Sequence, residues 1–185
     1  MSSPSPDKTK LAELVSKLAV VHGKVTLSSG IEAEYYVDLR RATLHHEAAV
    51  LVGKVMLDLL EENDLAPSAV GGLTMGADPV ATAMLHQASS RGLALDAFVV
   101  RKEAKKHGMA RQVEGPDIAG RKVVILEDTS TTGGSPLTAA KAAEEAGAEV
   151  LGIATAVDRD TGARAAIESA GYAYYSALSL SDLGL

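Results

Sequence analysis

From residue 69 onward, short apolar runs alternate with stretches of helical periodicity. The apolar runs lie at 69–74, 94–100, 122–127 and 150–157. The helical stretches lie at 77–88, 136–146 and 162–170. Short apolar runs are typical of buried strands, and their alternation with helices predicts β-α-β units. The pattern therefore predicts an α/β fold with a central, mostly parallel sheet flanked by helices on both faces.

The first third of the chain has a different pattern, which predicts a small N-terminal hood of helix and short strands. Residues 7–22 have an apolar face at helical spacing, formed by Leu11, Leu14, Val15 and Leu18. We expect two short strands, at 24–27 and 34–39, around a Ser28–Gly30 turn. A further helix is expected at 44–62. Residues 1–8 are polar with two prolines, so we expect a loose N-terminus.

One stretch, "VVILEDTSTTGGSP" at 123–136, combines a buried strand with unusual polar residues. Two acids, Glu127 and Asp128, end the apolar run. We predict Ser135 as N-cap and Pro136 as first residue of the following helix, with Gly147 just past its end. The loop then lies at the carboxyl end of a strand, where ligands of open α/β sheets bind.

The loop between this strand and helix has the chemistry of a phosphate site. Its hydroxyls, glycines and free main-chain N–H groups stand at a helix N-terminus, which favours an anion. Two carboxylates beside an anion are explained if the same ligand also presents hydroxyls or a metal, as a sugar phosphate does. The alternative is an ordinary capped turn with two solvated acids, although the loop has more polar groups than capping requires.

This pattern resembles the 5-phosphoribosyl-1-pyrophosphate (PRPP) motif of the type I phosphoribosyltransferases. The resemblance implies the fold of that family, with contacts from the two acids to the ribose hydroxyls and from the loop to the 5′-phosphate. The implied PRPP-binding residues of this motif are Glu127, Asp128, Thr129, Ser130, Thr131, Thr132, Gly133, Gly134 and Ser135.

A basic segment, "RKEAKKHGMAR" at 101–111, follows another predicted strand in a chain that is acidic overall. A solvated loop is the commonest fate of such a charge run. Its position at a strand's carboxyl end favours a mobile flap that closes over a polyanion. We therefore expect 101–118 to be a flexible catalytic loop.

The segment "RKEAKKHG" is similar to the catalytic loop of the orotate phosphoribosyltransferases, and "SSGIEAEYYVDLR" at 28–40 resembles their substrate-binding hairpin. The resemblance implies transfer of ribose 5-phosphate from PRPP to orotate, giving orotidine 5′-monophosphate and pyrophosphate in pyrimidine biosynthesis. The implied catalytic residues are Arg101, Lys102, Lys105, His107 and Asp128, and the first four also bind PRPP. The implied orotate-binding residues are Tyr36, Val37, Thr131 and Arg159. An arginine fork suits a carboxylated pyrimidine, although Arg159 has the alternative of an ion pair with Asp158 or Asp160.

Two positions depart from that family's pattern. Ser28 stands where a lysine is usual, and Thr74-Met75-Gly76 stands where Tyr-Lys-Gly is common. Two basic contacts to pyrophosphate are therefore missing, and Arg40 or Arg41 is a candidate replacement. The resemblance further implies Mg²⁺ that arrives with PRPP rather than at a site fixed by the protein. It also implies a homodimer in which Arg101, Lys105 and His107 reach the partner's site while Lys102 serves its own.

Composition narrows the alternatives. The 185 residues fit one domain, and the net charge of −6 disfavours nucleic-acid and acidic-membrane binding. The chain has no Cys and no apolar stretch typical of a signal peptide or membrane span, so we expect a cytoplasmic protein. Two rival functions remain: transfer to a purine or uracil, and a regulator that senses PRPP without catalysis. The basic segment argues against the first and the negative charge against the second.

Overall fold

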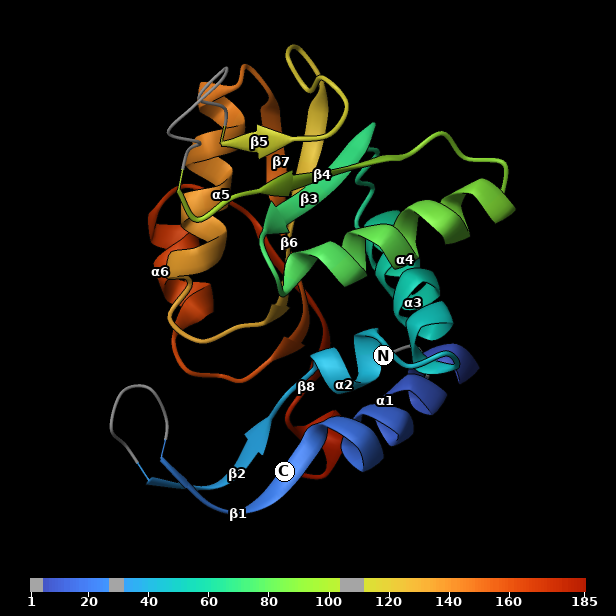
Figure 1. Cartoon of the computed structure of the whole chain (residues 1–185), viewed down its shortest axis with the longest axis vertical. Helices are drawn as coiled ribbons and strands as arrows, with labels where there is room; N and C mark the ends of the chain where they lie inside the picture. The colour runs from blue at the N-terminus through green and yellow to red at the C-terminus, as the bar shows by residue number, and fades with distance from the viewer. Residues whose placement is uncertain (1–4, 27–31, 104–111) are drawn as a thin grey trace.

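The computed structural model describes residues 5–26, 32–103 and 112–185. Its centre is a six-stranded sheet in the order β5-β4-β3-β6-β7-β8 (Figure 1). The strands are β3 (Ala69–Leu73), β4 (Asp96–Val100), β5 (Val113–Glu114), β6 (Lys122–Thr129), β7 (Glu149–Asp158) and β8 (Tyr174–Ser179). All neighbouring strands run parallel except β5, which pairs antiparallel with β4. The predicted α/β fold with a mostly parallel sheet is confirmed.

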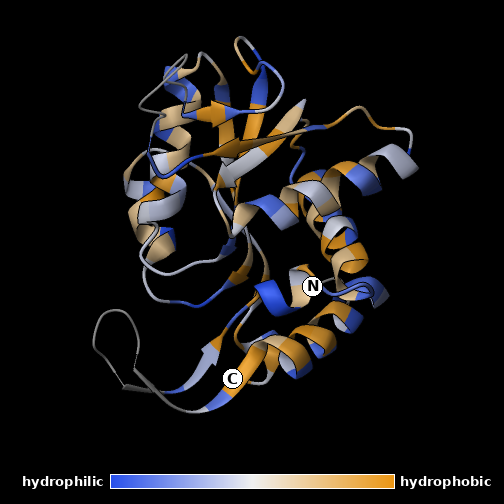
Figure 2. Ribbon diagram, viewed as in Figure 1, coloured by the Kyte–Doolittle hydropathy of each residue, from blue (hydrophilic) through white to orange (hydrophobic). Residues whose placement is uncertain are grey.

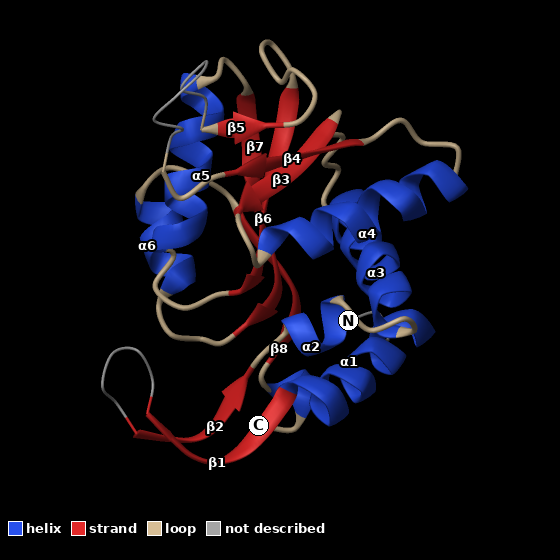
Figure 3. Ribbon diagram, viewed as in Figure 1, coloured by secondary structure: helices blue, strands red, loops and turns tan. Residues whose placement is uncertain are grey.

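Helices cover both faces of this sheet, as Figure 3 shows. They are α3 (Ala48–Glu62), α4 (Ala77–Ser90), α5 (Gly134–Glu145) and α6 (Ala163–Ser169). Alternate residues of β6 explain the two layers, because side chains of a strand point to opposite faces. Val124 and Leu126 join one hydrophobic core with α3 and α4, and Val123 and Ile125 join another with α5 and α6. Figure 2 shows the hydrophobic residues concentrated in the central strands.

The N-terminal hood consists of α1 (Pro6–Ala19), β1 (Val20–Thr26), β2 (Glu32–Val37) and α2 (Arg40–Thr43). The predicted loose N-terminus at 1–8 was wrong for its last residues, because Ser5 caps α1 by accepting a hydrogen bond from the Lys8 N–H at 3.2 Å. The helix ends at Ala19, three residues before the predicted end at residue 22, because Val20 pairs with Val37 in the β1–β2 hairpin. The helix predicted at 44–62 begins only at Ala48.

The basic loop is anchored at both ends, which corrects its predicted extent of 101–118. The Arg101 N–H donates to the Gln112 carbonyl at 2.9 Å, and the Gln112 side-chain amide donates to the Arg101 carbonyl at 3.0 Å. β5 then pairs with β4, and Ile118 is buried in the core. Residues 101 and 112 are therefore held together, and 113–118 belong to the scaffold.

The remaining connections complete the sheet. β8 follows α6 at one edge, and a short 3₁₀ helix, η1 (Ser181–Leu183), packs against α1. Sequence periodicity predicted neither β8 nor β5. In the described residues, the helices are too short or too polar to cross a bilayer.

Two adjacent glycines allow the central strands to approach closely. A Cβ on Gly72 of β3 would collide with the Leu126 carbonyl oxygen of β6, and one on Gly71 would collide with the Phe98 carbonyl oxygen of β4. Both obstacles are main-chain atoms of neighbouring strands, which cannot rotate away as a side chain can. These glycines therefore help to set the position of β3 beside the two acids that end β6.

We predict that Gly72→Ala lowers the free energy of unfolding by about 1–3 kcal/mol, because the added methyl overpacks a rigid region. Urea unfolding followed by circular dichroism measures the change. Gly134→Ala is the matched control, since a Cβ there meets no atom closer than Thr132 Oγ1 at 3.9 Å. Equal loss in both variants would contradict this account of the strand packing.

Candidate active site

A cavity of about 260 Å³ lies where the carboxyl end of β6 faces the β3–α4 turn and the hood. Its lining residues come from β2, α2, the end of β3 and the β3–α4 turn, the segment after β4, β6 and the start of α5, together with the link between β2 and α2. They are Tyr36, Val37, Asp38, Leu39, Arg40, Leu73, Thr74, Met75, Gly76, Lys102, Glu127, Asp128, Thr129 and Ser135. The cavity therefore brings together both acids, part of the predicted phosphate loop, the hairpin and the basic loop.

The two acids have different environments. Glu127 is 8 % exposed, and its burial, with a further contribution from neighbouring Asp128, raises its pKa to about 9. Asp128 is half-buried, and its Oδ1 accepts a hydrogen bond from the Thr129 N–H at 2.7 Å. Removal from water disfavours the charged form of a carboxyl group. The free protein therefore holds Glu127 protonated at neutral pH.

The β3–α4 turn lies directly against Asp128. A Cβ on Gly76 would approach the Asp128 carboxylate to 2.5 Å, so only glycine fits here without a shift of that side chain. Thr74 Oγ1 donates to Asp78 at 2.7 Å, which ties the turn to the first residues of α4. The sequence assigned no role to Gly76. Its position between an apolar strand and a helix was the available signal, but contact with Asp128 depends on the pairing of β3 with β6.

The loop after β6 corrects the predicted helix start. Gly133, not Ser135, occupies the N-cap position, and α5 begins at Gly134. The φ angle of Gly133 is 82°, a left-handed conformation that glycine adopts without the steric cost of a Cβ. Ser135 is consequently the second helical residue and Pro136 the third. Gly147 does lie just past the end of the helix, as predicted, with a φ of 87°.

Exposure divides the predicted phosphate-binding residues into two groups. The side chains of Thr131 and Thr132 are exposed, as are Gly134 and Ser135 at the start of α5. No side chain caps this helix, so the main-chain N–H groups of its first turn are available to an anion. Ser130 differs from these residues because it is only 2 % exposed and its side chain bonds to the protein.

Two predicted orotate-binding residues meet across the cavity edge. The guanidinium carbon of Arg159 lies 6.0 Å from the centre of the Tyr36 ring, which is within cation–π range. In the described part of the chain, Arg159 forms no ion pair with Asp158 or Asp160, so that alternative was wrong. Val37 also borders the cavity, but its side chain is 2 % exposed and packs in the core. A ligand in the cavity could therefore contact only the main chain of Val37.

The first residues of the basic loop are directed differently. Lys102 lines the cavity, whereas Arg101 is absent from its lining and pairs with Glu114 of β5 at 3.8 Å. Lys105 and His107 of the predicted loop, and Ser28 of the hairpin, lie outside the described residues. The structure thus places one of the four predicted basic-loop residues at this cavity.

Arg40 supplies a second cation. It lines the cavity, and its Nε donates to Asp38 Oδ1 at 2.9 Å. This hydrogen bond and the charge of Asp38 raise the pKa of Arg40. Arg41 is exposed on α2 and does not line the cavity. Of the two candidates for the missing basic contacts, Arg40 is therefore the one at the cavity.

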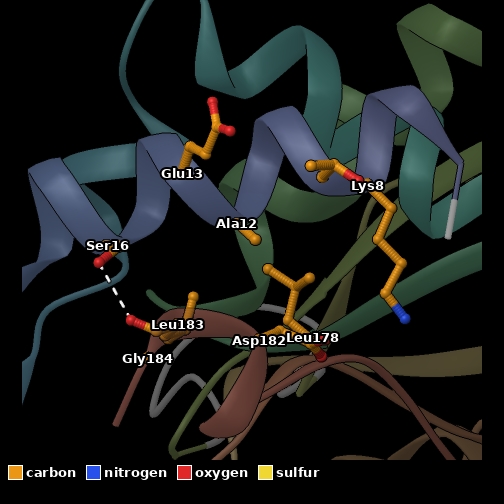
Figure 4. A pocket seen from close by; sticks show the side chains of 9 residues that line it. Lys8, Ala12, Glu13, Ser16, Leu178, Asp182, Leu183 and Gly184 are labelled. Carbon is orange, nitrogen blue, oxygen red and sulfur yellow. Dashed lines mark hydrogen bonds between the residues drawn. The ribbon is translucent and has the colours of Figure 1, made fainter.

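A larger cavity of about 370 Å³ lies between α1 and the C-terminal segment (Figure 4). Ala12, Leu178 and Leu183 contribute apolar surface to it. Its charged lining residues are Lys8, Glu13 and Asp182, so acids outnumber the one cation. It contains neither a glycine-rich loop nor an open helix N-terminus for a phosphate. Chemistry therefore favours the smaller cavity as the candidate active site.

Comparison with known proteins agrees with this geometry. A family model described as "Phosphoribosyl transferase domain" matches residues 42–170. An orotate phosphoribosyltransferase of Streptomyces avermitilis is 65 % identical over 176 residues, which cover 95 % of this chain and 96 % of the relative.

Solved structures give the same result. The chain is similar to a Mycobacterium tuberculosis orotate phosphoribosyltransferase in complex with PRPP, with a TM-score of 0.84, 54 % identity and coverage of 97 % of this chain and 100 % of that one. It also resembles the orotate phosphoribosyltransferase of Aeropyrum pernix, with a TM-score of 0.79, 31 % identity and coverage of 94 % and 95 %. The chain therefore belongs to the phosphoribosyltransferase family, among its orotate phosphoribosyltransferases.

Proposed function

We propose that this cavity transfers ribose 5-phosphate from PRPP to orotate, giving orotidine 5′-monophosphate and pyrophosphate for pyrimidine biosynthesis in the cytoplasm. One observation carries the proposal. Glu127 and Asp128 share a cavity with the start of an open helix N-terminus, and Arg159 lies over Tyr36 at the edge of that cavity. Acids for a sugar diol, N–H groups for a phosphate and a guanidinium for a carboxylate match the three parts of the product.

The loop and the two acids would hold PRPP. Main-chain N–H groups at the start of α5 face the 5′-phosphate, since free amides and the helix dipole both favour an anion. Asp128 accepts hydrogen bonds from the ribose hydroxyls. Glu127, protonated in the free protein, donates one to a ribose oxygen.

The reaction exchanges one bond at the ribose C1 for another. The bond to the pyrophosphate oxygen breaks, and pyrophosphate leaves with the electron pair. The bond to the orotate ring nitrogen forms, so no protein nucleophile is required. Positive charge develops on the sugar in between, and the Asp128 carboxylate lies on the cavity wall where it can stabilise that charge.

Cations at the cavity would receive the pyrophosphate. Lys102 and Arg40 both line the cavity and offer the positive charge that Ser28 and Met75 do not. Mg²⁺ binds through one or two carboxylates together with substrate phosphates, and Asp128 would supply one of them beside PRPP. When bound with PRPP, Mg²⁺ neutralises charge on the leaving pyrophosphate.

We also propose a homodimer whose active sites are shared. Arg101 pairs with Glu114 away from its own cavity, while its neighbour Lys102 lines that cavity. The side chains of these adjacent residues therefore point in different directions, Lys102 into the cavity and Arg101 toward β5. This arrangement supports a loop that supplies Lys102 to its own site and Arg101, Lys105 and His107 to the partner's.

Substrate choice tests the proposed reaction. Loss of orotate ultraviolet absorbance should require both PRPP and Mg²⁺, with one pyrophosphate formed per orotate consumed. Uracil lacks the carboxylate that we assign to Arg159, so its kcat/KM should be at least ~100-fold lower. Uracil or adenine used as efficiently as orotate would overturn the assignment.

Glu127 should make the stability of the free protein depend on pH. Its folded pKa is about 9, against 4.5 when solvated, so the folded state holds this proton more tightly than the unfolded chain. The stabilisation is present in full below about pH 4.5 and is lost as pH rises toward 9. Relative to Glu127→Gln, which cannot ionise, the free energy of unfolding of the wild type should fall by about 1.4 kcal/mol for each pH unit between the two pKa values.

Urea unfolding at pH 5, 6, 7 and 8, without Mg²⁺ or PRPP, measures this difference. Glu62→Gln on the surface of α3 controls for the loss of a carboxylate elsewhere. Parallel pH profiles for the wild type and Glu127→Gln would show that Glu127 is not buried as the structure places it.

Mixing two inactive variants tests the shared site. One variant carries Arg101→Ala and Lys105→Ala, and the other carries Asp128→Asn. Random pairing makes about half of the dimers mixed. If the loop acts in trans, each mixed dimer has one intact site, and about a quarter of wild-type activity should return. No recovery, with mixed dimers demonstrated by mass spectrometry, would refute sharing but not the reaction.

A further inference from the structure

We propose that Ser130 is a positioning residue for orotate, although it lies within the loop assigned to the 5′-phosphate. Its hydroxyl fixes the turn that carries Arg159, and so fixes the guanidinium that would meet the orotate carboxylate. This inference rests on the proposed function, because it assumes that Arg159 binds orotate. It assigns Ser130 to the second substrate instead of the first.

Both hydrogen-bonding groups that Ser130 could offer a phosphate already have partners in the protein. Its N–H donates to the Val157 carbonyl of β7 at 3.0 Å. Its hydroxyl donates to Asp158 Oδ1 at 2.7 Å and accepts from the Arg159 N–H at 3.0 Å. With 2 % of the residue exposed, a ligand cannot reach the side chain without breaking these bonds. Ser130 therefore faces the β7–α6 turn and not the cavity.

The turn that Ser130 contacts also has hydrogen bonds of its own. Asp158 Oδ1 also accepts from the Asp160 N–H at 2.9 Å, an Asx-turn that bends the chain just after β7. Asp160 has a φ of 52°, a left-handed conformation that is uncommon for residues other than glycine. Arg159 lies between these two residues, and its N–H donates to the Ser130 hydroxyl. Ser130 therefore fixes the main chain at the centre of the turn.

A neighbouring bond links the same two loops without involving Arg159. The Thr161 hydroxyl donates to the Thr131 carbonyl at 2.6 Å. Together, Ser130 and Thr161 join the first half of the phosphate loop to the turn after β7. The second half, from Thr132 to Ser135, has its exposed groups free for a ligand.

Loss of the Ser130 hydroxyl would leave the Arg159 N–H without its acceptor and Asp158 without one donor. A partly buried donor without a partner is costly, so the turn would shift to find another. The Arg159 guanidinium, 6.0 Å from the Tyr36 ring, would move with it. Such displacement weakens orotate binding but leaves the N–H groups at the start of α5 in place for the phosphate.

Steady-state kinetics with each substrate varied separately test the proposal. Ser130→Ala should raise the KM for orotate by ~10-fold, with the KM for PRPP within about 2-fold of wild type. Ser130→Thr keeps the hydroxyl and should restore most of the orotate KM. If the alanine variant does not fold, Ser130→Cys keeps the shape with weaker hydrogen bonds and should give the same selective effect.

A double variant with Arg159→Ala tests whether Ser130 changes the orotate KM through Arg159. If Ser130 acts through Arg159, adding Ser130→Ala to Arg159→Ala should change the orotate KM by less than about 2-fold. Ser16→Ala is the matched control for loss of a partly buried hydroxyl. Ser16 donates to the Leu183 carbonyl at 3.1 Å in the distant α1 cavity (Figure 4), so it should change neither KM.

The outcomes separate this inference from the proposed function. An orotate KM unchanged by Arg159→Ala would overturn both. A large effect of Arg159→Ala with none of Ser130→Ala would overturn only the positioning role. Equal increases in the KM for PRPP and orotate, or an effect of Ser130→Ala that persists in the Arg159→Ala background, would also overturn that role.

Discussion

The site depends on the parallel pairing of β6 with β3 on one side and β7 on the other. The pairing with β3 brings Gly76 against Asp128, and the pairing with β7 brings Ser130 against Asp158 and Arg159. Because parallel strands end at the same edge of a sheet, three loops far apart in the sequence meet there. The groups at this edge are thus positioned by the pairing of the main chains, and contacts between loop side chains add to it.

Electrostatics explains why acids and an anion site stand side by side. Burial keeps Glu127 protonated in the free protein, which leaves Asp128 as the acid with the more open environment. The start of α5 offers positive partial charge, and Lys102 and Arg40 add full charges on the cavity wall. A ligand with a phosphate at one end, hydroxyls in the middle and a diphosphate beside them satisfies each of these groups. This distribution suits PRPP better than an anion alone.

Sequence patterns predicted the central strands and the acids near the end of β6, because short apolar runs that alternate with helical stretches are typical of buried parallel strands. They did not predict β8, whose residues form neither an apolar run nor a regular alternation, or β5, which is too short for a period. The N-cap was misplaced at Ser135 because the helix begins after a left-handed Gly133, without any side-chain cap that a sequence pattern could indicate. The inward direction of Ser130 could not be predicted, since it follows from the register of β6 with β7. Roles for Lys105 and His107 still rest on family resemblance.

The most direct test of this account is the position of orotidine 5′-monophosphate in a crystal structure of its complex, because that one ligand contains phosphate, ribose and base. The account predicts the phosphate on the main-chain N–H groups at the start of α5 and the ribose hydroxyls facing Glu127 and Asp128. It places the base carboxylate on Arg159, beside Tyr36. A ligand with its phosphate away from α5, or its base away from Arg159, would contradict the assignment of the site.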